Sequence, residues 1–231
     1  MTSAVRGPVD GLTADGDRPA EESPHVADRI ARRAVAEREA EYASEVRRLL
    51  EAGLAVISRQ GTKSSPRVAD IVAEAGLSND VFYRHFKSKD DLVTAIVEMG
   101  TDRLLTRLLR QMDAVDTAEE KIGRWIAGVL NQASKPDVAD LVRATMWNAA
   151  RVSDDTSGRI AARESITRPI LALVAELGSA DPERDARMIC QSTMALMELF
   201  LWRREQPTKA DLDHLIGFCL HAVSDATSKS E

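Results

Sequence analysis

The sequence predicts an all-α protein in which a small N-terminal domain of three helices precedes a larger helical domain. Apolar residues recur at helical spacing along most of the chain, and no stretch alternates apolar with polar residues as a half-buried strand does. Helix-opening signals also recur, among them Thr117 with Glu120, then Pro136, Pro182 and the stretch 207–211. Apolar residues make up 44% of the 231, which is enough for a buried core.

The first 43 residues divide by composition. Residues 1–23 are rich in Gly, Pro, Asp, Ser and Glu, which predicts a disordered tail. Residues 24–43 are strong helix formers that carry four arginines at 29, 32, 33 and 38 among several glutamates. Two interpretations of this charged helical arm stay open: a solvated extension of the first domain helix, or an arm that contacts the minor groove or flanking phosphates of DNA.

A domain of three helices is predicted over residues 44–90. Its first helix has apolar residues at helical spacing from Val46 to Ile57. Ser65 and Pro66 predict the start of the second helix, with the serine as its cap. Gly76 can adopt the left-handed conformation that ends that helix, and Ser78 can cap the third. A short helix, a glycine turn and a second capped helix predict a helix-turn-helix.

The third helix and the segment after it resemble a known DNA-binding signature. The residues are Gly76-Leu77-Ser78, Phe82-Tyr83-Arg84-His85-Phe86 and Lys87-Ser88-Lys89-Asp90. Over about residues 44–98 the chain resembles TetR-family transcriptional regulators. One departure concerns the recognition helix, where the family often has Gly-Thr and this chain has Asp80-Val81.

The resemblance and the chemistry of the side chains nominate nine residues for DNA contact. Ser65, Tyr83, His85 and Lys89 match family positions that contact phosphates, and all four can donate hydrogen bonds. Arg67 and Lys87 are further phosphate candidates. Asn79, Asp80 and Val81 occupy the first turn of the recognition helix, which reaches base edges. Asp80 keeps two interpretations: an acceptor for cytosine N4, or a charge that complements the positive helix N-terminus.

The charge distribution agrees with a DNA-facing end. The net charge is −6, yet the stretch from Arg29 to Lys89 holds 12 Lys and Arg against 8 Asp and Glu. That stretch therefore carries +4, which leaves −10 for the rest of the chain. A basic end on an acidic body is typical of a regulator with one DNA-binding module.

Residues 91–231 are predicted to form a helical ligand-binding and dimerisation domain. Pro169 is expected to kink or restart the helix in which it lies. Large apolar side chains with a few polar groups among them predict a pocket for a small lipophilic effector. Each of these side chains is more often a core residue than a ligand contact. The candidates are Trp125, Arg143, Met146, Trp147, Asn148, Met188, Gln191 and Met194.

The last two predicted helices, from about Pro182 to Arg204 and from Leu212 to Val223, carry broad apolar stripes. The family resemblance implies that they pair with their copies in a second subunit, which makes a homodimer. The alternative is that they are only part of the intrachain core. A two-fold dimer suits a palindromic double-stranded DNA operator, because two recognition helices then meet two half-sites.

Other classes of function have little support. The chain shows no glycine-rich phosphate loop, no metal-ligand cluster and no nucleophile–base pair in context, so we expect neither an enzyme nor a cofactor or metal site. No apolar run is long enough to span a membrane, and no secretory signal precedes the helices. Cys190 and Cys219 are expected to be reduced, buried thiols in a cytoplasmic protein.

The function predicted from these residues is a ligand-responsive, sequence-specific transcriptional regulator. Repression released by a lipophilic effector is the expected mode of action. The alternative is an architectural DNA-binding protein that responds to no effector.

Overall fold

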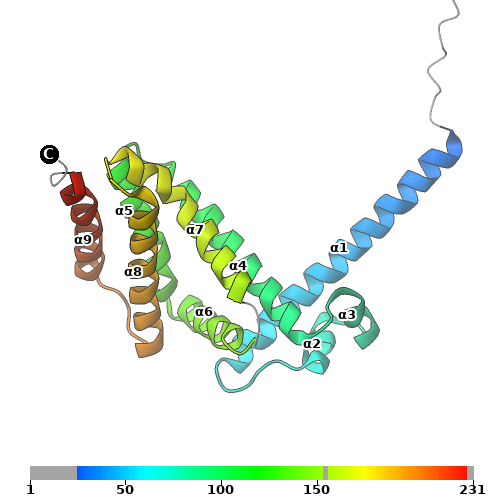
Figure 1. Ribbon diagram of the computed structural model, residues 1–231. Helices are drawn as coiled ribbons and strands as arrows, with labels where there is room; N and C mark the ends of the chain where they lie inside the picture. Colours follow the sequence, from blue (N-terminus) through cyan, green and yellow to red (C-terminus); the bar gives the residue numbers. More distant parts are fainter. Residues whose placement is uncertain (1–24, 153–155, 228–231) are drawn as a thin grey trace, which may run out of the picture. The chain divides into compact units, whose positions relative to one another are not determined.

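The computed structural model describes residues 25–152 and 156–227 (Figure 1). The tail predicted for residues 1–23 lies outside them. The described backbone is helical and contains no strand, which confirms the all-α class. In chain order the elements are α1 (Val26–Gln60), α2 (Val68–Ala75), α3 (Asn79–His85), α4 (Lys89–Met112), α5 (Ala118–Leu130), the 3-10 turn η1 (Asn131–Ala133), α6 (Pro136–Ala149), α7 (Thr156–Glu176), α8 (Pro182–Arg203) and α9 (Lys209–Thr227).

Two compact units are distinguished, one ending at Tyr42 and one beginning at Ala43. The described part of the first unit is the beginning of α1. Nearly all of its side chains are exposed, including Val26, Ile30 and Val35. Arg33 and Glu37 form an ion pair at 2.8 Å across one helical turn. Such an exposed pair contributes little to stability.

The N-terminal part of the second unit has its own apolar core, which we call the head core. It is formed by Leu49, Ala52, Val56, Ile57, Ile71, Val72, Ala75, Phe82, Phe86, Leu92, Val93, Ile96 and, from α6, Ala144. Helices α1 and α4 approach closely at Gly53, where an added Cβ would lie 2.9 Å from both Ile96 Cδ1 and Leu92 Cδ2. The head core fixes α2 and α3 against these two longer helices.

The other helices enclose a second and larger cluster, the body core. Its fully buried members include Trp125, Ile122 and Ile126 of α5 and Ile170 of α7. Helix α4 packs against α5, α6 and α7, and α8 packs against α5 and α7 (Figure 1). Helix α4 belongs to both cores, because its first half contributes to the head core and Leu108 and Met112 to the body core.

Most predicted helix starts are confirmed. Thr117 and Glu120 form a reciprocal capping box at the start of α5, and Pro136 and Pro182 stand in the first turns of α6 and α8. A second reciprocal pair precedes α9, where Thr208 N donates to Asp211 Oδ2 at 2.8 Å and Asp211 N to Thr208 Oγ1 at 3.2 Å.

One predicted helix start was wrong. Ser65 does not cap α2, which begins at Val68 after an extended Arg67 that makes no side-chain cap. The backbone of Arg67 is extended, with φ −104° and ψ 146°, so α2 begins two residues later than a cap at Ser65 would place it. Of the two outcomes expected at Pro169, a kink or a restart, the restart does not occur, because α7 runs from Thr156 to Glu176 with the proline inside it.

Both cysteines are free and buried, as predicted. Burial raises the pKa of the Cys190 thiol, and it raises that of Cys219 to about 11. None of the helices in the described part of the chain is long and apolar enough to cross a membrane.

Candidate nucleic-acid interface

The turn between α2 and α3 has the geometry of a helix-turn-helix. Gly76 ends α2 in the left-handed conformation, with φ 62° and ψ 40°. Leu77 N donates to Val72 O at 2.9 Å, which satisfies a carbonyl at the helix end. Ser78 then starts α3, and its Oγ accepts from Val81 N at 3.3 Å. The predicted roles of Gly76 and Ser78 are therefore confirmed.

Two aromatic residues one turn apart anchor α3. Phe82 is completely buried and Phe86 nearly so, and both belong to the head core. Tyr83 meets the ring of Phe82 edge to face, with centroids 5.3 Å apart, but 58% of its own surface is exposed. Burial of one face of α3 leaves the opposite face of the helix, with Tyr83 at its margin, toward solvent.

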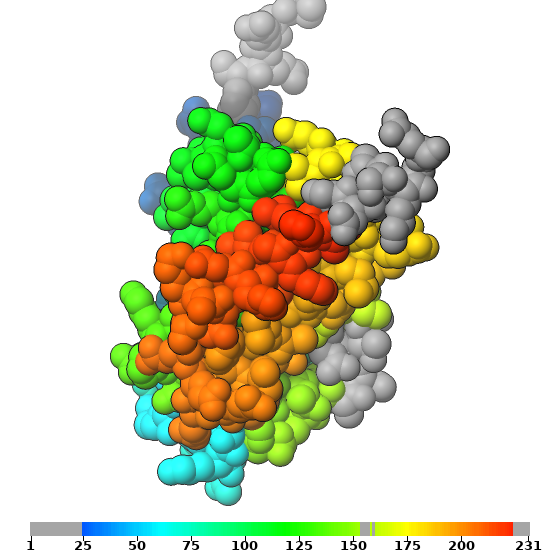
Figure 2. Space-filling view, turned by 90° about the vertical axis from the view of Figure 1, so that its left-hand side faces the viewer, coloured from blue at the N-terminus to red at the C-terminus, as the bar shows by residue number. Residues whose placement is uncertain are grey.

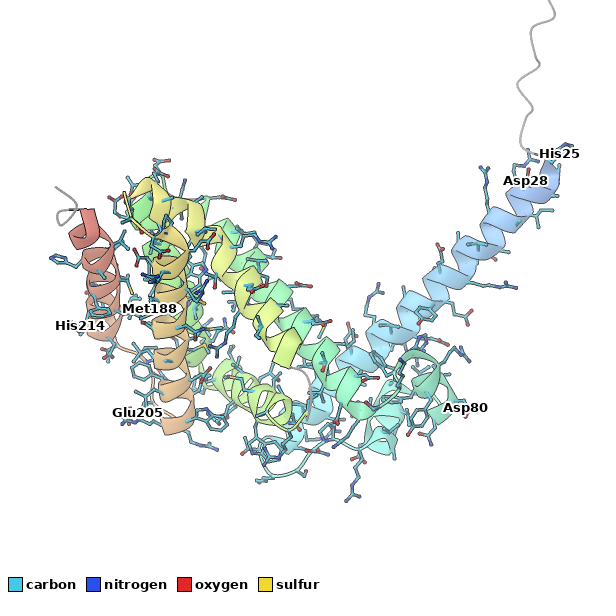
Figure 3. All side chains as sticks on the ribbon, viewed as in Figure 1. His25, Asp28, Asp80, Met188, Glu205 and His214 are labelled. Carbon is cyan, nitrogen blue, oxygen red and sulfur yellow. The ribbon has the colours of Figure 1, made fainter. Side chains whose placement is uncertain are left out.

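The nine predicted DNA contacts lie before α2, on α3 and between α3 and the first residue of α4. Asn79, Asp80 and Tyr83 are exposed on α3, and Figure 3 labels Asp80 at its first turn. Arg67 and Lys87 are exposed before α2 and after α3. The four remaining residues are half-buried: Ser65, Val81, His85 and Lys89.

His85 lies differently from the other candidates. Its side chain is fully buried, and its Nε2 lies 2.6 Å from Glu45 Oε2 of α1. The same carboxylate lies 3.3 Å from Arg84 Nη1. The ring of His85 therefore points toward α1 and links the end of α3 to that helix. In this position the ring is not exposed to a DNA phosphate.

Helix α1 also supports the turn itself. Arg48 Nη2 donates to Ala75 O at 2.6 Å and to Gly76 O at 3.1 Å. Sequence reasoning missed Arg48 and Glu45, since their partners lie 27 to 40 residues away. Their spacing of three, which puts both on one face of a helix, is the only signal the sequence offered.

The start of α4 continues directly from the recognition helix. Ser88 caps it by accepting from Asp91 N at 3.1 Å. Asp91 Oδ2 in turn accepts from Lys87 N, the residue before the cap, at 2.9 Å. These bonds fix Lys87 and Lys89 beside the end of α3.

The predicted effector residues lie on three helices, α5, α6 and α8. Three are buried and satisfied within the chain: Trp125 Nε1 donates to Ile166 O at 3.0 Å, Arg143 Nη1 to Leu201 O at 2.9 Å, and Asn148 Nδ2 to Ala144 O at 2.9 Å. Burial, together with the nearby Arg204, lowers the pKa of the Arg143 guanidinium. Its ion pair with Asp140 offsets part of that cost.

The other five lie nearer the surface. Met146 and Met194 pack against the edge of the body core. The guanidinium of Arg151 covers the ring of Trp147 at 3.3 Å. Gln191 is exposed and bonds to Arg163 of α7. Met188 is 60% exposed on α8, far from Asp80 of α3 (Figure 3).

A cavity of about 30 Å³ lies between α4, the end of α6 and the start of α7. It has room for about one water molecule and none for a lipophilic effector. None of the eight predicted effector residues lines it. The lining residues are Val93, Thr94, Val97, Glu98, Ala149, Val152, Gly158 and Ala162.

Four large apolar side chains are exposed on α8 and α9, with exposed fractions from 42% to 61%, and we call them together the α8–α9 face: Met188, Leu199, Trp202 and Phe218. Figure 2 shows α9 and the end of α8 at the surface of the second unit. Four large apolar side chains on two neighbouring helices are typical of a protein–protein contact.

Comparison with known proteins agrees with this geometry. A model of bacterial regulatory proteins of the tetR family matches residues 49–96. The HTH-type transcriptional repressor Rv3405c of Mycobacterium tuberculosis is 28% identical over 130 residues, which are 51% of this chain and 66% of that protein. A Mycobacterium bovis protein, the HTH-type transcriptional regulator Mb3439c, matches to the same extent. The chain thus spans slightly less than two thirds of these curated relatives.

Solved structures share the fold over a longer span. A transcriptional regulator from Rhodococcus sp. Rha1 superposes with a TM-score of 0.59 at 18% identity, covering 78% of this chain and 96% of that one. A TetR-family transcriptional regulator from Pectobacterium atrosepticum superposes with a TM-score of 0.54 at 25% identity, covering 80% and 92%. The likeness therefore includes the body as well as the helix-turn-helix.

Proposed function

This chain belongs to the tetR family of bacterial regulatory proteins, and from that premise we propose that it is a sequence-specific repressor that a small molecule releases from DNA. The observation that carries the proposal is the α2–turn–α3 unit with its exposed polar residues. Asn79, Asp80 and Val81 at the first turn of α3 would read base edges, and Tyr83 with Arg67, Lys87 and Lys89 would hold phosphates.

We propose that the form of the protein that binds DNA is a homodimer whose subunits meet through the α8–α9 face. A monomer that exposes Trp202 and Phe218 leaves apolar surface in water, and a second copy would cover it. Two-fold symmetry would place two copies of α3 on two half-sites of a palindromic operator, about 34–36 Å apart.

For the effector we propose a lipophilic molecule that enters the body by separating its helices. Pockets for such ligands measure about 300–1,000 Å³, far more than the cavity beside α4. Because α4 contributes to both cores, displacement of its body half would change the spacing of the two recognition helices. The small cavity equally favours the second candidate, a DNA-binding protein with no effector.

The decisive experiment measures binding of the full chain to the DNA that flanks its own coding region and to a scrambled duplex of the same length. A sequence-specific regulator prefers the first by about a thousandfold or more. The Tyr83→Ala, Lys89→Ala double variant, which removes two proposed phosphate contacts on each subunit, should bind both duplexes more weakly. Equal affinity for both duplexes would reject sequence-specific regulation at this site, and selective binding that no panel of lipophilic compounds weakens would reject only the effector.

A further inference from the structure

Arg84 lies on the outer face of the recognition helix. It follows the buried Phe82 by two residues, which is about 200° around a helix, and it stands one turn after the exposed Asp80. More than half of its side chain, 57%, is exposed. On position alone, Arg84 would be a phosphate contact, because the outer face of α3 is the one presented to DNA.

The guanidinium of Arg84 is nevertheless held by α1. Its Nη1 lies 3.3 Å from Oε2 and 3.5 Å from Oε1 of Glu45. The Glu45 carboxylate is only 14% exposed, and the buried His85 ring contacts it at 2.6 Å. A carboxylate already fixed by another partner loses little entropy when it pairs with a cation, so it competes well for the guanidinium.

We infer that Glu45 is a specificity-determining residue that keeps Arg84 from binding the DNA backbone. The inference rests on the proposed DNA-binding function. Affinity for DNA of any sequence comes from cations that neutralise phosphates. Because Glu45 withholds the Arg84 guanidinium from phosphates, affinity for DNA of any sequence is lower, while the contacts to bases are unchanged. The ratio of specific to nonspecific affinity therefore rises.

The test is Glu45→Gln, which keeps the size of the side chain and an oxygen acceptor for His85 but removes the charge. Binding to a short scrambled duplex is measured by fluorescence anisotropy over a series of salt concentrations. We expect the variant to bind about fivefold more tightly. The slope of log K against log salt should steepen by about 0.9 for each bound recognition helix, since each Arg84 then neutralises one phosphate.

Two controls distinguish the release of Arg84 from a general effect of charge or folding. Glu51→Gln makes the same charge change at an exposed position of α1 that takes part in none of the described ion pairs, and its slope should stay as in the wild type. In an Arg84→Ala background, Glu45→Gln should change nothing. Equal effects of the two Gln variants, or a Glu45→Gln effect that survives without Arg84, would overturn the inference.

A single substitution gives a second, independent readout. With Arg84 held by Glu45, Arg84→Gln should leave both the scrambled-DNA affinity and the salt slope of the wild type within error. A slope that becomes shallower by about 0.9 per recognition helix would mean that Arg84 already binds phosphate, which overturns the inference. The proposed function fails separately, through equal affinity of the wild type for its flanking and scrambled DNA.

Discussion

Arg48 of α1 donates from Nη2 to the carbonyl oxygen of Ala75, 2.6 Å away, although 27 residues separate the two in the chain. Ala75 is the last residue of α2, where carbonyls lack helical partners and the helix dipole is negative. One cation thus satisfies the end of α2 and fixes the turn that leads to α3.

Arg48→Ala should lower the free energy of unfolding by about 1 kcal/mol, because two carbonyls at the turn lose a charged donor. Operator affinity should also fall, since the angle between α2 and α3 is less well fixed. Urea unfolding followed by circular dichroism measures the first effect. Arg47→Ala, at an exposed neighbouring position, is the control and should be neutral; equal losses in both variants would contradict the role given to Arg48.

Gly76→Ala should destabilise the protein by roughly 1–2 kcal/mol. The residue has a φ of 62°, which costs a residue with a Cβ about that much, and the new Cβ would lie 3.3 Å from Arg48 Nη2. Gly100→Ala in α4 is the matched control. An added Cβ there meets nothing within 4 Å, so alanine should be neutral or stabilise by about 0.4–1 kcal/mol. Thermal unfolding would disprove the strain argument if both variants melted alike.

Gly128→Ala should destabilise the contact between α5 and α4. Its Cβ would collide with Leu108, which is completely buried, and would lie 2.7 Å from Gln111 Oε1. Overpacking of this kind costs typically about 1–3 kcal/mol. On the same helix, Gly123→Ala meets only Ile216 at an ordinary 3.6 Å and should be tolerated. A larger loss for Gly123→Ala, in denaturant titrations of both, would be evidence against the packing of α4 on α5.

Phe218→Asp should convert the proposed dimer to a monomer, because a carboxylate at the centre of an apolar contact is desolvated without a partner. Sedimentation velocity gives the mass directly. Leu109→Asp, at an exposed apolar position of α4, should leave the mass unchanged. A Phe218→Asp protein of wild-type mass would show that the α8–α9 face is not the interface.

Stability should fall as pH rises from about 9 to about 11, because a folded-state pKa near 11 means that folded Cys219 keeps its proton where the unfolded thiol has lost it. The stabilising contribution is complete below about pH 9 and is lost as pH approaches 11. The raised pKa of the Cys190 thiol should likewise make stability fall as pH rises. Urea midpoints near pH 8 and pH 10.5 measure the loss, which Cys219→Ala should reduce; an equal loss in that variant would assign the effect to other groups.

Much of the fold could be predicted because its signals are local. Gly76 and Ser78 specify the turn by conformation and capping alone, and Phe82 and Phe86 are one turn apart on a seven-residue helix. The start of α2 could not be predicted from Ser65, since the chain stays extended past Pro66. A cap requires both a polar side chain and a backbone that turns at that residue.

The candidate site was only partly predictable, for a different reason. Asn79, Asp80 and Tyr83 are exposed on α3, as the recognition-helix interpretation needs. The position of His85 depends on Glu45, which is 40 residues away, and no local pattern reports that pairing. For the effector, type and spacing did not distinguish core residues from ligand contacts, and the buried Trp125 and Asn148 already have partners within the chain.

Helix α4 also determines where this protein could be recombined with a relative. Its head-core residues end at Ile96, and its fully buried body-core residues begin at Leu108. Between them stands Gly100, where an added Cβ would touch nothing. A hybrid joined at this point would keep the body core whole, and of the buried head-core residues only Ala144 of α6 would come from the relative. The helix is therefore a crossover point at which the body can be exchanged for that of a relative while the helix-turn-helix is kept.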